Sequence, residues 1–473
     1  MAGWLGVAEN ASPPLISLFS PGASGLRIQL LLPAGDIHRN NTGIFKRSLR
    51  YAPLTLTTLA ALVPKELSAQ VEIQDEGVGP IDLNFDADLV GISAITGTAN
   101  RSYELADTLR ARGHTVVLGG VHPTLMPAEA AQHADAVVSG YAEESWPELL
   151  RDFAASRMRS FYQQPTGRKL DVPIARREML DPKRYATVNS IEATRGCPHR
   201  CDFCAVPAAW GGIYAHRPLD EVIAELETFE DRKALFIDLS PVENVKYAKE
   251  LYRRMIPLRM KWVGLATTRI AEDRELLKLA AESGCRGLLI GFEAIDQATL
   301  DGTRKQFHSA AGYADIVKRL HDHGIGIQGC FVFGFDSDGK DVFERTVEFV
   351  DRAHIDLPRY AVLTPFPGTA AYKQLEDENR LLHRDWSRYD VEHVVFRPAK
   401  MTPEQLQEGL HWAWKQSYGY SSIARRLWGS RTVLPLSLTL NIGYRYFARH
   451  LAGRTPVADL NQYSIVEPSQ ACE

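Results

Sequence analysis

Three cysteines lie close together in one short stretch, Cys197, Cys201 and Cys204, with the spacing C-x3-C-x2-C. Cysteine thiolates hold iron–sulfur clusters, and three of them can bind three irons of a cubic [4Fe–4S] cluster. The fourth iron then keeps an open position for another ligand. The alternatives are three structural thiols or part of a zinc site, but no C-x2-C or H-x3-H pair follows to complete a zinc site. The spacing therefore predicts a [4Fe–4S] cluster with one open iron.

The residues around these cysteines resemble the signature of radical S-adenosylmethionine (radical SAM) enzymes. The sequence Arg-Gly-Cys-Pro begins at Arg195, and the aromatic Phe203 precedes the third cysteine, as is usual in that family. The resemblance implies that the three cysteines bind the cluster and that its open iron chelates the amino and carboxylate groups of SAM. It also implies that Phe203 belongs to the SAM site.

Length and composition set broad limits. A chain of 473 residues suggests two or three domains, and its net charge of −4 does not indicate nucleic-acid binding. No run of 18 apolar residues occurs and Glu9 interrupts the N-terminal stretch, so we expect neither a transmembrane helix nor a secretory signal. The other cysteines, Cys285, Cys330 and Cys472, do not suggest a disulfide framework. Reduced thiols and an oxygen-sensitive cluster predict a cytoplasmic location.

The N-terminal part reads as an α/β domain. Residues 1–25 contain several prolines and glycines and are expected to form a loose arm. Residues 26–150 alternate short apolar strands with helical patterns, which predicts a doubly wound, Rossmann-like parallel sheet. The expected strands are 26–32, 71–75, 87–93, 115–118 and 136–139.

Small residues follow several of these strands. Ligands of doubly wound sheets bind at the carboxyl ends of the strands, which here carry Ser93, Gly119, Gly120 and Gly140. Glycine allows a large ligand to approach the backbone closely. The pattern resembles the cobalamin-binding domain fused to many radical SAM enzymes. The resemblance implies that Ser93, Gly119 and Gly120 surround the nucleotide tail of cobalamin, and Gly140 is expected to contact the cofactor as well.

One motif departs from a related pattern. In cobalamin domains of the methionine-synthase type, the histidine of D-x-H-x-x-G ligates cobalt. Here Asp36-x-His38 is followed by Asn41 where the glycine should fall, and Gly43 comes two residues late. Many radical SAM relatives bind cobalamin without this motif, so we expect His38 to be a loop histidine rather than a cobalt ligand. The alternative for the whole domain is a fold that has lost its cofactor.

The strand–helix alternation resumes after a basic linker at residues 151–188. Six βα units follow in residues 189–390, with helices ending at glycines such as Gly284 and Gly324. This pattern fits an open (β/α)6 partial TIM barrel, which is the core fold that the radical SAM resemblance implies. The expected strands are 190–194, 234–238, 261–266, 287–292, 325–335 and 359–363.

Barrel enzymes place their chemistry at the carboxyl ends of the strands. The resemblance implies that the end of the second strand receives the amino group of SAM and that the fourth contacts its ribose or carboxylate. Asp238 and Glu293 take these positions, and Thr364 at the end of the sixth strand is expected near SAM. Leu239 stands where relatives often have a second acid. The alternatives for the two acids are a helix cap or an ion pair.

The C-terminal residues 391–473 are expected to be mainly helical. Thr402 and Pro403 are typical of a helix start, as N-cap and first helical residue. The segment 434–451 is apolar with several basic residues on it. It could line a substrate entrance, lie on a membrane surface or pack against the barrel.

The combined resemblance implies cobalamin-dependent methylation of an unactivated carbon. In such enzymes SAM is cleaved to a 5′-deoxyadenosyl radical, and methylcobalamin delivers the methyl group. The alternatives are cyclisation or rearrangement without methyl transfer, aminocarboxypropyl transfer from SAM, and a cobalamin or iron–sulfur sensor without turnover. The expected partners are a small-molecule or lipid-like substrate and an electron donor such as flavodoxin or ferredoxin. We do not expect a nucleic-acid partner. A membrane surface is an alternative partner that no sequence motif indicates.

Overall fold

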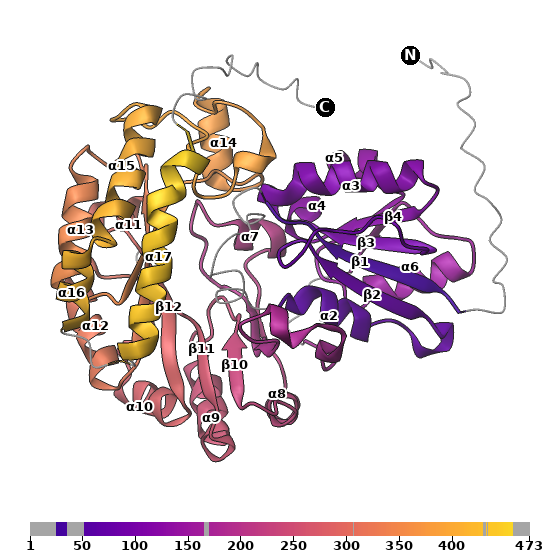
Figure 1. Cartoon of the computed structure of the whole chain (residues 1–473), viewed down its shortest axis with the longest axis horizontal. Coiled ribbons are helices and arrows are strands. Elements are labelled where there is room, and N and C mark those ends of the chain that lie inside the picture. The colour runs from indigo at the N-terminus through magenta and orange to yellow at the C-terminus, as the bar shows by residue number, and fades with distance from the viewer. Residues whose placement is uncertain are drawn as a thin grey trace, which may run out of the picture.

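Two parallel six-stranded sheets and a cap of helices make up the protein (Figure 1). This architecture confirms the expected α/β class, with a doubly wound N-terminal sheet, a barrel-like second sheet and a helical C-terminal region. His38 and the residues from Asp36 to Gly43 lie outside the described part, as does most of the expected N-terminal arm. The structure is a computed structural model, which describes residues 25–35, 52–164, 170–305, 307–428, 432 and 434–456.

The N-terminal sheet is parallel throughout and has the strand order β2-β1-β3-β4-β5-β6. The order changes direction between β1 and β3, and this switch point is where doubly wound sheets bind ligands. The sequence anticipated five of these strands. The sixth, β6, falls within residues 151–188, so the sheet extends past the expected boundary at residue 150. The strands are β1 (Arg27–Leu32), β2 (Gln70–Asp75), β3 (Leu89–Ser93), β4 (Thr115–Gly119), β5 (Ala136–Ser139) and β6 (Phe161–Gln163).

Helices cover both faces of this sheet, as its nearly continuous apolar strands require. On one face α2 (Leu54–Ala61) and α6 (Ser145–Ala154) pack over β1 and β3, with Leu56, Trp146 and Leu149 in the core. On the other face lie α3 (Ala99–Ala111), α4 (Val121–Leu125) and α5 (Pro127–His133) (Figure 1).

The second sheet is also parallel and has the order β14-β13-β12-β11-β10-β7. Its two end strands, β7 and β14, do not pair with each other, so the sheet stays open, as expected for a partial barrel. Its strands are β7 (Ser190–Ile191), β10 (Lys233–Phe236), β11 (Lys261–Ala266), β12 (Cys285–Glu293), β13 (Gly326–Phe333) and β14 (Leu357–Val362). The helices between them are α8 (Leu219–Glu227), α9 (Val245–Met255), α10 (Arg274–Glu282), α11 (Gln297–Gly302), α12 (Tyr313–Asp322) and α13 (Val342–Arg352).

A short antiparallel hairpin interrupts the barrel after its first strand. It consists of β8 (Thr194–Gly196) and β9 (Tyr214–His216), and α7 (Ala205–Trp210) lies between the two strands. All three cysteines of the C-x3-C-x2-C motif lie between β8 and α7. The first barrel strand is thus only two residues long, and the longer strand expected at 190–194 is divided between β7 and β8.

The C-terminal helices pack against α13 and β14. Thr402 caps α15 as expected, since its hydroxyl accepts a hydrogen bond from Gln405 N at 3.2 Å. The fully buried Arg426 holds α16 in place by donating to the carbonyls of Asp356 and Ser417, both at 2.6 Å. Within the described residues, no helix has the length and apolar character needed to cross a membrane. The helices are α14 (Ala370–Asp377), α15 (Pro403–Ser417), α16 (Tyr420–Trp428) and α17 (Leu434–Arg454).

Candidate active site

Three contacts hold the cysteine loop in place, one across the β8–β9 hairpin and two to later parts of the barrel. Gly196, just before the first cysteine, has φ +80°, and a Cβ there would lie 1.9 Å from Ile213 O across the hairpin. Any other residue would therefore push β8 away from β9. Asp202 N donates to Thr303 O at 3.3 Å, and Asp202 O accepts from Ala371 N at 3.0 Å. These contacts fix the loop against the segments that follow β12 and β14.

The three thiols of this loop are partly exposed and lie near one another. Burial raises the pKa of all three, and that of Cys201 to about 12, so the free chain holds them protonated at neutral pH. A metal centre bound here would have to displace these protons. No three His, Cys, Asp or Glu side chains of the described residues converge closely enough to hold a single metal ion.

Glu293 faces the thiols from the end of β12. Its backbone has φ +64°, a region that a non-glycine residue adopts only under constraint, and the pairing of β12 with β13 shifts its register there. Lys305 Nζ donates to its carboxylate at 2.5 Å and to Gly291 O at 2.9 Å. Both charges act on the Cys201 and Cys204 thiols. No pattern in the sequence pointed to Lys305, which reaches this place from the loop after α11.

Asp238 follows β10 and is enclosed by polar groups of the segment between β7 and β8. Its carboxylate is fully buried and accepts hydrogen bonds from Ala193 N at 3.1 Å and Thr194 Oγ1 at 2.7 Å, and a further one from Thr194 N. Burial raises its pKa to about 7, although these hydrogen bonds oppose the shift. In this structure, Asp238 therefore holds the chain between β7 and β8 in the position from which the cysteine loop starts.

A second acid, Glu243, lies closer to the cysteine loop. Its carboxylate contacts His199 Nε2 at 3.1 Å and accepts from Arg269 at 2.6 Å and from Ser240 Oγ at 2.9 Å. His199 in turn stacks on Phe307, with ring centroids 3.6 Å apart. Sequence reasoning missed Glu243 because it lies five positions after Asp238, and only folding of the loop after β10 brings it beside the cysteines.

Phe203 and Thr364 have different surroundings. Phe203 contacts Phe335 edge to face at 5.7 Å and lines a cavity of about 220 Å³ beside the loop, together with Leu363 and Thr303. Thr364 is buried, and its hydroxyl donates to Val362 O at 3.3 Å. Its neighbour Leu363, rather than Thr364 itself, lines the cavity.

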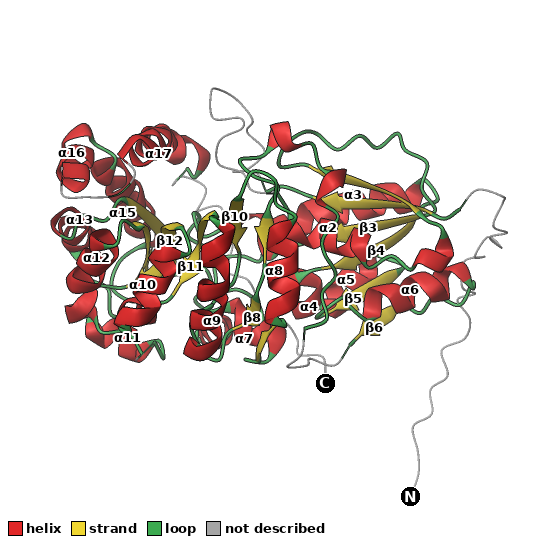
Figure 2. Cartoon of the chain, turned by 90° about the horizontal axis from the view of Figure 1, so that it is seen from below, coloured by secondary structure: helices red, strands yellow, loops and turns green. Residues whose placement is uncertain are grey.

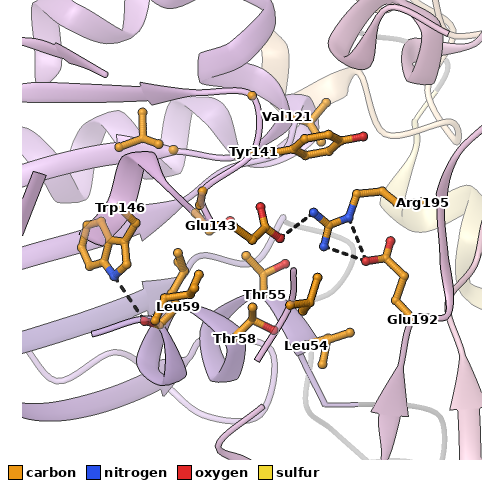
Figure 3. Close-up of a pocket in the computed structure, with 18 of the residues that line it drawn as sticks. Leu54, Thr55, Thr58, Leu59, Val121, Tyr141, Glu143, Trp146, Glu192 and Arg195 are labelled. Atoms are coloured by element: carbon orange, nitrogen blue, oxygen red, sulfur yellow. Dashed lines mark hydrogen bonds and ion pairs between the residues drawn. The ribbon is translucent and has the colours of Figure 1, made fainter. Parts of the chain in front are cut away.

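A larger cavity of about 350 Å³ lies between the two domains (Figure 3). It is formed where the carboxyl ends of β3, β4 and β5 meet α2 and the start of the cysteine loop. All four residues expected at a cobalamin site line it, namely Ser93, Gly119, Gly120 and Gly140. Most of its wall is apolar, and Leu54, Leu59 and Trp146 contribute to it.

The two glycines with positive φ at this cavity have different local constraints. At Gly120 (φ +101°) a Cβ would lie 2.6 Å from Ala94 O, so the turn itself excludes a side chain. At Gly140 (φ +78°) no protein atom lies within 4 Å of such a Cβ. The backbone at Gly140 therefore faces open space in the cavity, which fits close approach by a large flat ligand such as a corrin.

Arg195 joins the two domains at the wall of the cavity (Figure 3). It donates to Glu143 of the N-terminal domain at 2.6 Å and to Glu192, which precedes β8, at 2.8 Å. Its guanidinium also lies over the ring of Tyr141, 4.8 Å from the centroid, and that ring stacks against Trp210 at 6.2 Å. Arg195 directly precedes Gly196-Cys197, so this contact couples the strand ends of the first sheet to the cysteine loop.

Two family models match the chain: the radical SAM superfamily at residues 191–350 and the B12 binding domain at residues 67–150. Bacteriochlorophyllide d C-12(1)-methyltransferase of Chlorobaculum tepidum is 33% identical and the match covers 80% of this chain and 85% of the relative. Bacteriochlorophyllide d C-8(2)-methyltransferase of the same organism is 30% identical, and the match covers 86% of this chain and 94% of the relative. Anaerobic magnesium-protoporphyrin IX monomethyl ester cyclase of Cereibacter sphaeroides is 25% identical, and the match covers 72% of this chain and 61% of the relative.

The solved structures show the same arrangement of domains. The radical SAM methyltransferase TsrM of Kitasatospora setae, with cobalamin and a [4Fe–4S] cluster bound, matches with a TM-score of 0.64 at 17% identity, over 93% of this chain and 99% of that one. The fold and the site thus define a radical SAM enzyme. The chain belongs to the family of radical SAM enzymes that carry a B12-binding domain, and its cofactors are a [4Fe–4S] cluster, SAM and cobalamin.

The contact of Arg195 with Glu143 predicts a large effect of one substitution. Arg195→Gln should lower the stability of the folded chain by about 2 kcal/mol, because it leaves two partly buried carboxylates without their shared cation. Arg200→Gln, an exposed arginine of the same loop, should change it by less than about 1 kcal/mol. Thermal unfolding midpoints compare the two variants. Equal midpoints would show that the interdomain contact contributes nothing measurable.

Proposed function

We propose that this chain is a cobalamin-dependent methyltransferase that adds a methyl group to an unactivated carbon of a small molecule. The observation that carries the proposal is the interdomain cavity, where the glycine-lined strand ends of the first sheet adjoin the residues leading into the cysteine loop. The two bacteriochlorophyllide methyltransferases support it and favour a tetrapyrrole as the methyl acceptor. The match to a cyclase keeps cyclisation as the second candidate.

Each cofactor has residues that fit it. Cys197, Cys201 and Cys204 would hold the cluster. Ser93, Gly119 and Gly120 would lie along the tail of cobalamin, and Gly140 would face its corrin ring. When bound, the cluster and SAM supply a hydrogen-abstracting 5′-deoxyadenosyl radical, and methylcobalamin supplies the methyl group. The chain contributes a cavity with mostly apolar walls, which limits access of water to reactive species.

The polar residues around the thiols would position SAM. Glu293, held by its backbone conformation and by Lys305, would accept hydrogen bonds from the ribose or amino group of SAM. Glu243, rather than the occupied carboxylate of Asp238, would be the second acceptor, with His199 and Arg269 setting its orientation. Phe203 would contact SAM from the side of the smaller cavity, whereas Asp238 and Thr364 would act indirectly by shaping the backbone.

The proposal includes two further expectations from the sequence. A small electron donor such as flavodoxin or ferredoxin would reduce the cluster, and the thiols and the cluster would require a reducing compartment such as the cytoplasm.

Cys285 is fully buried in β12, where burial raises the pKa of its thiol, and burial likewise raises the pKa of the Cys330 thiol in β13. Neither belongs to the cysteine loop.

The cluster ligands can be tested by metal content. Anaerobically reconstituted chain should hold about four irons, and joint replacement of Cys197, Cys201 and Cys204 by alanine should remove them. Cys285→Ala and Cys330→Ala are matched controls and should retain the iron. Iron and sulfide analysis with optical spectra measures the outcome. A cluster that persists after the triple change would contradict the assignment.

The reaction can be tested with SAM labelled in its methyl group and a panel of tetrapyrroles as acceptors. Methyl transfer predicts labelled product together with S-adenosylhomocysteine and 5′-deoxyadenosine. Glu293→Gln should reduce all three products while retaining the iron and cobalamin content, because it removes a charged acceptor and little volume. Formation of 5′-deoxyadenosine and modified acceptor without S-adenosylhomocysteine would favour cyclisation, and methylthioadenosine would indicate aminocarboxypropyl transfer.

A further inference from the structure

One C-terminal segment of this chain carries basic residues and no acidic ones. Residues 409–458 contain seven lysines and arginines and no aspartate or glutamate, although the whole chain has a net charge of −4. The rest of the chain therefore has eleven more acidic than basic residues. The segment therefore has a net positive charge, to which the exposed Arg449 contributes, whereas Arg426 is buried and Arg425 pairs with Asp351.

The same segment exposes large apolar side chains. Leu436, Leu438 and Ile442 of α17 are 49%, 45% and 48% exposed, and Tyr420 and Trp428 of α16 are 72% and 93% exposed. Isolated exposed apolar residues are common on protein surfaces, but a group on two adjacent helices marks an interaction surface. These five residues, together with Tyr446, Arg445 and Arg449, are called the C-terminal patch below.

The patch is organised along one face of α17. Leu438, Ile442 and Tyr446 follow one another at intervals of four residues, so they lie on one side of the helix. Arg445 lies three residues after Ile442, and Arg449 lies four residues after Arg445. Both arginines therefore fall on the same side of the helix. Arg445 also lies over the ring of Tyr420, 3.8 Å from its centroid, which joins α16 to this face.

The opposite side of α17 packs on the protein. Asn441 and Leu451 are completely buried, and the hydroxyl of Tyr444 accepts a hydrogen bond from Gln328 Nε2 of β13 at 2.7 Å. The helix is thus fixed with its apolar and basic face outward. Figure 2 shows α16 and α17 on the side of the barrel away from the N-terminal domain, so the patch does not face the interdomain cavity.

We propose that the C-terminal patch docks the enzyme on the surface of an anionic lipid bilayer. Helices that lie in the membrane interface combine aliphatic and aromatic side chains with arginine, as this face does. The aliphatic side chains would enter the boundary of the acyl chains, while the exposed Arg449 extends to the lipid phosphates. Arg445, which donates to Tyr418 O at 2.6 Å, would hold the ring of Tyr420 in place. Trp428 and Tyr420 have the amphipathic rings that favour the headgroup level.

Charge and composition argue against two other occupants. A symmetric dimer through this face would bury Arg449 of both copies in one interface, where the patch has no acidic side chain to pair with it. A nucleic acid would leave the exposed leucines and isoleucine without apolar partners, since its binding relies on phosphate contacts and base stacking. An anionic bilayer satisfies both the charged and the aliphatic side chains.

Co-flotation of the cofactor-loaded chain with vesicles tests the proposal. We expect binding to vesicles of phosphatidylcholine mixed with phosphatidylglycerol, weaker binding to phosphatidylcholine alone, and loss of affinity as salt is raised. Arg449→Glu should weaken binding ~5-fold or more. Leu438→Ser combined with Ile442→Ser should weaken it by about tenfold or more. Unchanged iron content and unfolding midpoint would show that these exposed substitutions leave the fold intact.

Matched controls separate the patch from general surface properties. Lys278→Glu on α10 reverses an exposed charge, and Ile256→Ser removes a partly exposed aliphatic side chain elsewhere on the barrel. Both should bind vesicles like the unchanged protein. The proposal is overturned if the chain does not bind anionic vesicles or if patch and control variants bind equally. It is also overturned if Ile442→Ser only converts a dimer into a monomer, or if an oligonucleotide binds at the patch and vesicles do not.

Discussion

The ion pair between Arg195 and Glu143 is the contact on which the arrangement of the site depends. Arg195 precedes the first cysteine by two residues, and Glu143 lies just past the end of β5 in the other domain. Both side chains are largely buried, so their charges lose solvation that only close pairing can restore. Glu192 and the ring of Tyr141 complete the surroundings of the guanidinium. This geometry brings the carboxyl ends of two separate sheets to one cavity.

The two domains therefore offer different binding surfaces to the shared cavity. The first sheet presents bare backbone at Gly119, Gly120 and Gly140, which suits a large planar ligand. The barrel presents thiols and the charged pair Glu293–Lys305, which suits a metal cluster and a charged cofactor. Radical chemistry requires the reacting atoms to meet at contact distance, so a rigid junction between the two surfaces is itself a functional requirement.

Much of this organisation could be predicted from the sequence. The C-x3-C-x2-C spacing is a local signal, and the alternation of apolar strands with helices indicated both sheets. The glycines after the strands were also predictable, since parallel strands place their carboxyl ends along one edge of a sheet. Thr402 and Pro403 marked the start of α15 for equally local reasons. The structure confirms the fold class and brings Ser93 and the three glycines to one cavity.

The remaining features depend on contacts between distant residues. Nothing near Lys305 in the sequence indicates that it will pair with Glu293, and Glu243 reaches the cysteine loop only through the path of the loop after β10. Asp238 stood at the expected strand end, yet its carboxylate binds Ala193 and Thr194 of the neighbouring segment. The strand β6 was missed because three residues carry little periodic pattern, and pairing with β5 defines it.

The central claim is that cluster and cobalamin are bound on either side of the Arg195 junction, close enough to act on one substrate. Electron paramagnetic resonance of the fully loaded protein tests it most directly, with the cluster reduced and the cobalt in its paramagnetic divalent state. We expect the two spins to interact, with splitting or enhanced relaxation of the cobalt signal that is absent when the cluster is oxidised. Signals that are unaffected by each other's oxidation state would contradict a shared site.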